Sequence, residues 1–148
     1  MPAVCDDGVV QVKAKEFRYA IGLGADGSVS TESGASLAFG AEWTPEHLLL
    51  AGLVRCSLDS LRHHLGRADI ELVSSIGGAS AVVTRRESDG RYAVVEATVE
   101  LSVQLEPAPA PDAVAELLAK AERDCFVGAS LAAKPSYRWI VNGRERDR

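Results

Sequence analysis

The chain has 148 residues, of which 47% are hydrophobic and 25% are charged, so a single soluble domain of residues 1–148 with a real core is expected. Its net charge of -5 argues against a nucleic-acid surface, and its longest apolar run, residues 48–54, is too short to span a bilayer. Three cysteines, an odd number without close pairing, indicate a reducing compartment and hence a cytoplasmic location.

The N-terminal part of the chain predicts a small set of strands. Apolar and polar residues alternate over residues 9–23, which predicts a strand, with a bulge near residues 16–18 where the phase changes. The segment "GADGS", residues 24–28, is a turn signal, and "VSTES" after it can return as a second strand. A short third strand is expected in "SLAF", residues 36–39.

A helix is predicted from Pro45 to about Leu65. Thr44 can cap this helix, Pro45 suits its first position, and Glu46 suits the positive end of the helix dipole. Gly66 is a suitable stop. Residues 48–54 are apolar on every side of the helix, which a surface helix would not be.

Two long segments, residues 70–86 and 91–106, predict a hairpin joined by "ESDG". The second is the clearest strand of the chain, because alternate residues along it are apolar. The residues on this apolar face are Ala93, Val95, Ala97, Val99, Leu101, Val103 and Leu105.

The C-terminal part predicts a second helix and a last strand. After the stiff connector "PAPAP", a helix is expected from Pro111 to about Cys125, and residues 136–143 are expected to form the closing strand. The apolar stripe of this helix consists of Val114, Leu117, Leu118, Ala121 and Cys125. The order of strands, helix, hairpin, helix and strand indicates an α+β fold with mainly antiparallel pairing, since the connections suit hairpins better than crossovers.

Cys56 and Cys125 are expected toward the C-terminal parts of the two helices, on or beside apolar faces. A thiol peroxidase needs a cysteine that can form a thiolate, a nearby cation, and a second cysteine to discharge the sulfenic acid. These two cysteines are candidates for that chemistry. The alternative is structural, because free cysteine is often buried simply as a small apolar residue. Cys5 lies near the terminus and is expected to be incidental.

Other candidate residues have simpler interpretations. Glu46 is either a catalytic carboxylate or a helix-start residue, and the second is commoner. His63 and His64 are neighbours on a helix, point in different directions and lack a third ligand, so a solvated helix end is expected rather than a metal site. The segment "GLGADG" lacks the full GxGxxG pattern and a following helix, so it does not indicate a dinucleotide site.

Taken together, these segments resemble the OsmC/Ohr family of thiol-dependent hydroperoxide reductases. The resemblance covers nearly the whole chain, and it depends on the order and spacing of its motifs rather than on any one of them. The segment "TPEHLLLAGLVRC" is similar to the family's Pro-Glu-x-Leu helix opening with the first cysteine ten residues after the glutamate. The other similar segments are "GSVSTESG", "AKAERDCFVGASL" around the second cysteine, and the terminal "YRWIVNG".

The resemblance implies antiparallel sheets around two central helices, assembled as an intertwined homodimer with active sites at the subunit interface. It implies that Cys56 is the peroxidatic cysteine and Cys125 the resolving one, with Glu46 orienting a catalytic arginine. The substrate would be a small organic hydroperoxide, the reductant an external dithiol, and no metal or organic cofactor is implied. Ten helical residues separate Glu46 from Cys56 by roughly 15 Å, so a bridging arginine or a partner subunit must complete the site.

The chain departs from the family pattern at the arginine. The family places it at the turn after the first strand, where this chain reads "GLGADGS" with no basic residue. Without a cation, a cysteine is mostly neutral thiol at pH 7. Arg18 on the first predicted strand is the expected substitute. Arg55 adjoins Cys56 but should project elsewhere, and Asp59 would raise the cysteine pKa if it faced the thiol.

Two functions follow from these features. The first is reduction of organic hydroperoxides by Cys56 and Cys125, as part of oxidative-stress defence. The second is a non-catalytic OsmC-like dimer that holds a small apolar or thiol-reactive ligand in its interface cleft. The two retained cysteines favour the enzyme, and the missing arginine favours the binding protein.

Overall fold

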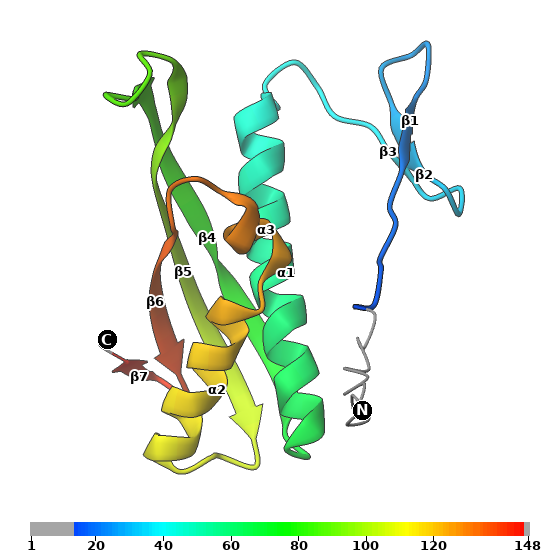
Figure 1. Cartoon of the computed structure of the whole chain (residues 1–148). Coiled ribbons are helices and arrows are strands. Elements are labelled where there is room, and N and C mark those ends of the chain that lie inside the picture. The colour runs from blue at the N-terminus through cyan, green and yellow to red at the C-terminus, as the bar shows by residue number, and fades with distance from the viewer. Residues whose placement is uncertain (1–13, 147–148) are drawn as a thin grey trace, which may run out of the picture. The chain divides into compact units, whose positions relative to one another are not determined.

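The computed structural model describes residues 14–146 and divides into two compact units, one within residues 1–42 and the other within residues 43–148. Each unit is described by itself. Within residues 14–146, the first contains a three-stranded antiparallel sheet, and the second contains the helices together with a four-stranded sheet (Figure 1).

The first unit is a short meander of β1 (Ile21–Leu23), β2 (Val29–Thr31) and β3 (Ser36–Leu37). The predicted turn between the first two strands is present, and Gly27 supplies its positive φ of 82°. The predicted strand over residues 9–23 is wrong in its length: residues 14–20 are not strand, and residues 9–13 lie outside the described residues. β2 pairs with β1 only as far as Ile21, because a second turn after Thr31 ends it.

The second unit begins with the long helix α1 (Pro45–Arg67). The predicted start is confirmed, because the Thr44 hydroxyl accepts a hydrogen bond from the His47 amide and the His47 ring accepts one from the Thr44 amide. The predicted stop at Gly66 is early. The helix continues through that residue, and the left-handed conformation that follows is taken by Asp69, with φ of 55°.

The sheet of this unit has the strand order β4-β5-β6-β7. Its strands are β4 (Glu71–Arg85), β5 (Tyr92–Glu106), β6 (Ser136–Val141) and β7 (Arg144–Arg146). The β4–β5 and β6–β7 pairs are antiparallel, as expected for hairpins, but β5 and β6 are parallel. The expectation that the connections suit hairpins better than crossovers fails at this one connection, while mainly antiparallel pairing is confirmed.

The crossover from β5 to β6 contains two helices instead of the one predicted. These are α2 (Pro111–Arg123) and the short α3 (Phe126–Ser130). Cys125 lies between them with extended backbone, φ -71° and ψ 109°, so the chain turns there instead of continuing as one helix. The part of the chain that the structure describes thus has three helices, of which α1 and α2 are the long ones.

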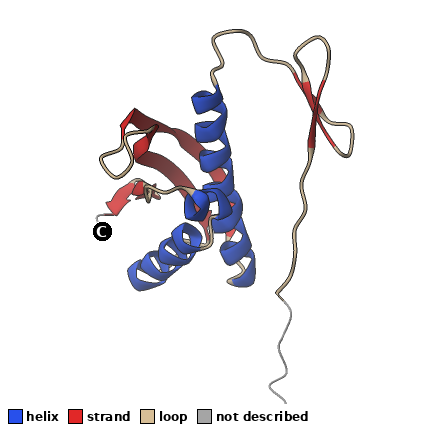
Figure 2. Cartoon of the chain, turned by 45° about the horizontal axis from the view of Figure 1, so that its top comes forward, coloured by secondary structure: helices blue, strands red, loops and turns tan. Residues whose placement is uncertain are grey.

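The helices cover one face of the four-stranded sheet (Figures 1 and 2). The predicted apolar face of β5 is confirmed from Ala97 to Leu105, where alternate side chains are buried. They pack with the buried stripes of α1 and α2 in one core. The helix members of this core are Leu53, Leu61, Leu65, Val114, Leu117, Leu118 and Ala121. The apolar stripes of α1 and α2 therefore pack on the apolar face of β5, which gives a layer of helices on one layer of sheet.

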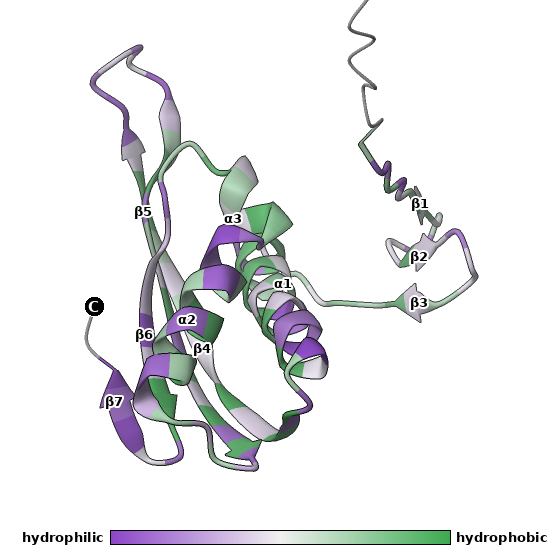
Figure 3. Cartoon of the chain, turned by 60° about the horizontal axis from the view of Figure 1, so that its bottom comes forward, coloured by the Kyte–Doolittle hydropathy of each residue, from purple (hydrophilic) through white to green (hydrophobic). Residues whose placement is uncertain are grey.

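The first half of α1 is less covered than its composition predicts. Within residues 48–54 only Leu53 is fully buried. Figure 3 shows that α1 changes along its length, from mostly hydrophobic at first to mostly hydrophilic in its last turns. An all-round apolar helix segment therefore keeps part of its surface accessible in this chain. None of the helices within residues 14–146 combines the length and apolarity needed to cross a bilayer.

Candidate active site around two cysteines

Cys56 lies in the middle of α1, not toward its end, and is partly exposed. Its Sγ atom accepts a hydrogen bond of 3.5 Å from the backbone N–H of Val127 in α3. The cysteine therefore borders the core and stays partly exposed.

Cys125 is fully buried and caps α3, where its Sγ atom accepts a hydrogen bond of 3.3 Å from the N–H of Gly128. Val127 and Gly128 are consecutive, so two neighbouring amides of one short helix contact the two sulfurs. The structure thus brings together the two cysteines that the sequence singled out. They are far apart in the sequence, since Cys125 comes 68 positions after Ser57, which directly follows Cys56.

The environment of Cys56 raises its pKa. Burial is the largest cause, and the hydrogen bond and the negative charge of the neighbouring Cys125 act in the same direction, while the amides of Val127 and Phe126 lower it. These influences from the described residues include no cation. Within this chain Cys56 therefore favours the neutral thiol, which is the less nucleophilic form.

Ser57 and Tyr137 complete the polar surroundings of Cys125, and the sequence analysis missed both. The Ser57 hydroxyl donates to the Leu53 carbonyl at 2.8 Å and lies 3.7 Å from Cys125 Sγ and 3.2 Å from the Tyr137 hydroxyl. The Tyr137 ring stacks on Trp139, with centroids 6.0 Å apart and planes at 7°. Burial raises the pKa of Tyr137 to about 12, so its phenol is neutral.

A signal for Ser57 was present in the sequence. Ser57 occupies the same helix stripe as Leu53, Leu61 and Leu65, spaced four residues apart, and it is the buried polar residue of the described core. A polar residue in such a stripe needs a hydrogen-bond partner. Its partner Tyr137 comes from β6, 80 residues later, and no local pattern gives that distance.

Glu46 lies exposed in the first turn of α1, on the same helix as Cys56. Its own backbone amide and the Thr44 hydroxyl lower the pKa of the carboxyl group, so it is ionised at neutral pH. A helix rises roughly 1.5 Å per residue, so one chain does not bring its own Glu46 to its own Cys56. The helix-start interpretation is sufficient for the contacts within this chain.

Arg18 lies before β1 in the first unit, in a segment that is not strand, and pairs with Glu16 at 3.0 Å. Arg18 and Cys56 belong to different units. Next to Cys56, Arg55 projects into solvent and pairs with Asp59 at 3.1 Å, as its place on the helix suggested. Asp59 also pairs with Arg62, so its carboxylate is neutralised on the exposed side of α1.

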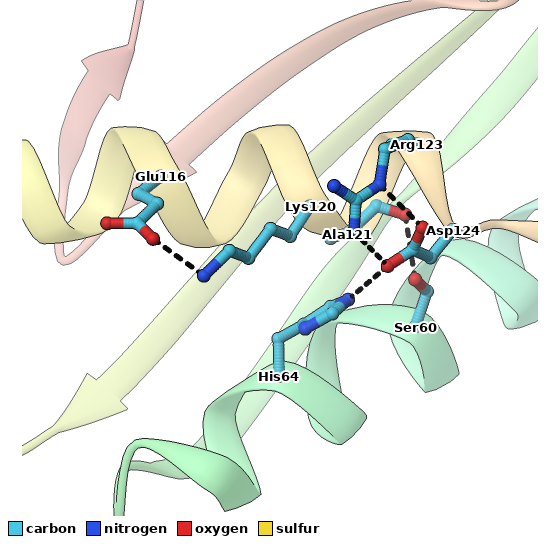
Figure 4. A network of polar contacts seen from close by, with 7 residues as sticks. All are labelled: Ser60, His64, Glu116, Lys120, Ala121, Arg123 and Asp124. Atoms are coloured by element: carbon cyan, nitrogen blue, oxygen red, sulfur yellow. Dashed lines mark hydrogen bonds and ion pairs between the residues drawn. The ribbon is translucent and has the colours of Figure 1, made fainter.

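His64 departs from the expected solvated helix end. Its Nε2 lies 2.8 Å from Asp124 Oδ2, and the side chain is 12% exposed (Figure 4). Asp124 also receives two hydrogen bonds from Arg123, and Ser60 donates to the Ala121 carbonyl at 2.8 Å. These contacts fasten the end of α2, and hence Cys125, to α1. In residues 14–146 no group of three or more His, Cys, Asp or Glu side chains is arranged to hold a metal.

Comparison with known protein families shows to which family this chain belongs. The family model described as "OsmC-like protein" matches residues 38–139, which include both cysteines. The chain belongs to the OsmC-like family. A search of curated proteins finds no significant match for this OsmC-like chain.

Solved structures share the OsmC-like fold at low sequence identity. An OsmC-like protein of Mycoplasma pneumoniae is 15% identical, with a TM-score of 0.64 over 87% of this chain and 99% of that one. An OsmC-like protein of Vibrio cholerae is 14% identical, with a TM-score of 0.65 over 76% of this chain and 82% of that one. An organic hydroperoxide resistance protein of Legionella pneumophila is 20% identical, with a TM-score of 0.54 over 87% and 98%.

Proposed function

We propose that this OsmC-like protein reduces organic hydroperoxides, with Cys56 as the peroxidatic and Cys125 as the resolving cysteine. The observation that carries the proposal is the placement of the two sulfurs on the consecutive amides of Val127 and Gly128. One thiol is partly open and the other is fully buried beside it. This asymmetry suits a pair in which one sulfur meets the peroxide and the other waits for the sulfenic acid.

The proposed reaction uses these two thiols and an external dithiol as the reductant. The Cys56 thiolate attacks the distal peroxide oxygen, the O–O bond breaks, and the leaving alkoxide takes a proton to become an alcohol. Cys125 then attacks the sulfenic sulfur, the S–S bond forms and the S–O bond breaks, and water leaves. A dithiol reductant restores both thiols by exchange with the disulfide.

The first step needs a cation near Cys56, and we infer that Arg18 supplies it in the assembled protein, with Glu46 orienting the guanidinium. Arg18 is the basic residue closest in sequence to the turn where the family places its arginine. A guanidinium beside a cysteine stabilises the thiolate and would offset the burial that raises the pKa of Cys56.

We further infer a cytoplasmic homodimer in which residues 1–148 act as one OsmC-like domain. Large apolar side chains remain exposed on β4 and at the adjoining end of β5, including Ile76 at 77% and Tyr92 at 69%. β4 is also an edge strand of its sheet. A long apolar edge strand is normally covered, and a second copy of the chain would cover it together with the first half of α1.

A specific observation also favours the second candidate, a non-catalytic protein that holds an apolar or thiol-reactive ligand. The pKa of Cys56 is raised within this chain, and the described residues that act on it include no cation. A thiol that stays neutral at pH 7 reacts slowly with peroxide.

Treatment with one equivalent of cumene hydroperoxide, followed by intact-mass and peptide mapping, separates the two candidates. We expect wild type to form a Cys56–Cys125 disulfide and Cys125→Ser to accumulate a sulfenic acid at Cys56. In Cys56→Ser, Cys125 should stay reduced. Equal oxidation of the two single variants, or no disulfide in oxidised wild type, would refute the two-cysteine mechanism and leave the binding protein.

A further inference from the structure

The polar contacts of Ser57 restrict how hydrogen atoms can be shared around Cys125. A serine hydroxyl has one proton, and here it is donated to the Leu53 carbonyl at 2.8 Å. Towards Tyr137 and Cys125 the Ser57 oxygen can then only accept. Because a backbone carbonyl does not take up a proton, Ser57 cannot pass one on, and it acts as a fixed acceptor instead of a relay.

Among Ser57, Cys125 and Tyr137, the Tyr137 phenol is consequently the group whose O–H can turn from one acceptor to another. Its hydroxyl can donate to Ser57 Oγ at 3.2 Å in the resting state. It also lies close to Cys125: a Cβ atom added to Gly128 would sit 3.3 Å from the Tyr137 hydroxyl and 3.4 Å from Cys125 Sγ. Gly128 has no such atom, so the phenol and the sulfur both border the position that a side chain would fill there.

We propose that Tyr137 is a positioning residue for Cys125, whose phenol turns from Ser57 to donate a hydrogen bond to the sulfur as it becomes a thiolate. This inference rests on the proposed function of Cys125 as the resolving cysteine. In the resting protein the Cys125 thiol and the Tyr137 phenol both donate to Ser57. When the thiol proton leaves, the phenol and the Gly128 amide together stabilise the negative sulfur that attacks Cys56.

The surroundings favour this phenol as the donor. Burial raises the pKa of Tyr137 to about 12, and the negative charges of Cys125 and Glu122 act in the same direction, so the phenol keeps its proton at neutral pH. The titratable and charged groups around the pair are Cys56 from α1, Glu122 from α2 and the salt-bridged Asp124 beside Cys125. β5 places the uncharged Val99 opposite Tyr137.

Tyr137→Phe tests the proposal, because it removes the hydroxyl and keeps the ring that stacks on Trp139. Tyr92→Phe is the matched control, since it removes a phenol hydroxyl at the start of β5, where Tyr92 pairs with Arg85, and keeps the apolar ring on the surface proposed for the dimer. After one equivalent of cumene hydroperoxide, rapid quenching measures Cys56 oxidation and disulfide closure separately. We expect Tyr137→Phe to leave the first step unchanged and to slow closure roughly tenfold at neutral pH, with the midpoint of its pH profile raised by about one unit.

A second measurement does not depend on peroxide chemistry. Carbon NMR titration of the Cys125 Cβ, in a Cys56→Ser background, should show a Cys125 pKa about one unit higher in Tyr137→Phe than with Tyr137 intact. An unchanged pKa and an unchanged closure profile would overturn the proposal. If wild-type Cys56 stays reduced with peroxide, the proposed function fails, and the NMR comparison still decides whether Tyr137 stabilises the Cys125 thiolate.

Discussion

His64 of α1 and Asp124, which directly precedes Cys125, are joined by a hydrogen bond of 2.8 Å between Nε2 and Oδ2. The same carboxylate receives two hydrogen bonds from Arg123. This carboxylate therefore ties the segment that carries one cysteine to the helix that carries the other.

The first prediction concerns the acid sensitivity of this link. Arg123, and after it His64, lowers the pKa of Asp124 from 3.8 to about 2. A carboxyl group whose pKa is lower in the folded state stabilises the protein above its unfolded pKa, and that stabilisation is lost as the pH falls from 3.8 through about 2. We expect Asp124→Asn to be less stable than wild type at neutral pH, with the difference shrinking over this window.

Urea unfolding at a series of pH values measures this difference. Asp69→Asn is the control, because asparagine accepts the left-handed backbone of Asp69, with φ of 55°. A stability difference between wild type and Asp124→Asn that stays constant down to pH values of about 2 would show that the carboxylate is not preferentially ionised in the folded state.

The second prediction concerns Arg18. If Arg18 is the cation that serves Cys56, Arg18→Ala should raise the pKa of Cys56 by about one unit and slow its oxidation by organic hydroperoxide roughly tenfold at neutral pH. The pH dependence of Cys56 alkylation and stopped-flow peroxide reduction give the two values. Arg55→Ala is the matched control, since Arg55 adjoins Cys56 but pairs with Asp59 in solvent. If only Arg55→Ala changes these values, the roles are reversed.

The third prediction concerns two adjacent glycines of β4. A Cβ atom on Gly77 would collide with the backbone carbonyl oxygen of Glu100 on β5, whereas one on Gly78 would meet nothing within 4 Å. We expect Gly77→Ala to lower the free energy of unfolding by about 1–3 kcal/mol, because the strands must separate to admit the methyl group. Gly78→Ala should change it by no more than about 0.5 kcal/mol. Equal effects in denaturant titrations would contradict the close approach of the two strands.

The fourth prediction concerns the exposed edge of the sheet. We expect the protein to sediment as a dimer at micromolar concentration, with a thermal midpoint that rises with protein concentration. Ile76→Lys, at a side chain that is 77% exposed, should shift sedimentation toward the monomer. Ala115→Lys on the exposed side of α2 is the control. A wild-type chain that stays a folded monomer would exclude the dimer.

The parts of the fold that the sequence predicted are those with local causes. The cap at Thr44, the alternation along β5 and the turn after β1 all depend on neighbouring residues. The parallel pairing of β5 with β6 was missed, because it joins segments separated by the whole of α2 and α3. The hairpin to β7 had a local signal in Asn142 and Gly143, both with positive φ, but the charged residues after it do not alternate in polarity.

The candidate site divides in the same way. The spacing of motifs identified Cys56 and Cys125 as a pair, and the structure brings their sulfurs to neighbouring amides. The spacing of motifs did not reveal the roles of Ser57 and Tyr137, because their contact depends on how β6 is placed relative to α1 in the folded chain. The place of Arg18 relative to Cys56 stays a prediction, because it depends on contacts beyond either unit alone.

The parallel strand β6 also has a kinetic consequence. The crossover that carries Cys125 is closed only when β6 pairs with β5, and Tyr137 arrives with that same strand. During synthesis, α1 and the β4–β5 hairpin emerge and can form from contacts close in sequence, whereas the second sulfur is anchored last. A nascent chain that ends before residue 125 therefore contains Cys56 without Cys125, and oxidation at that stage would have no resolving thiol to capture it.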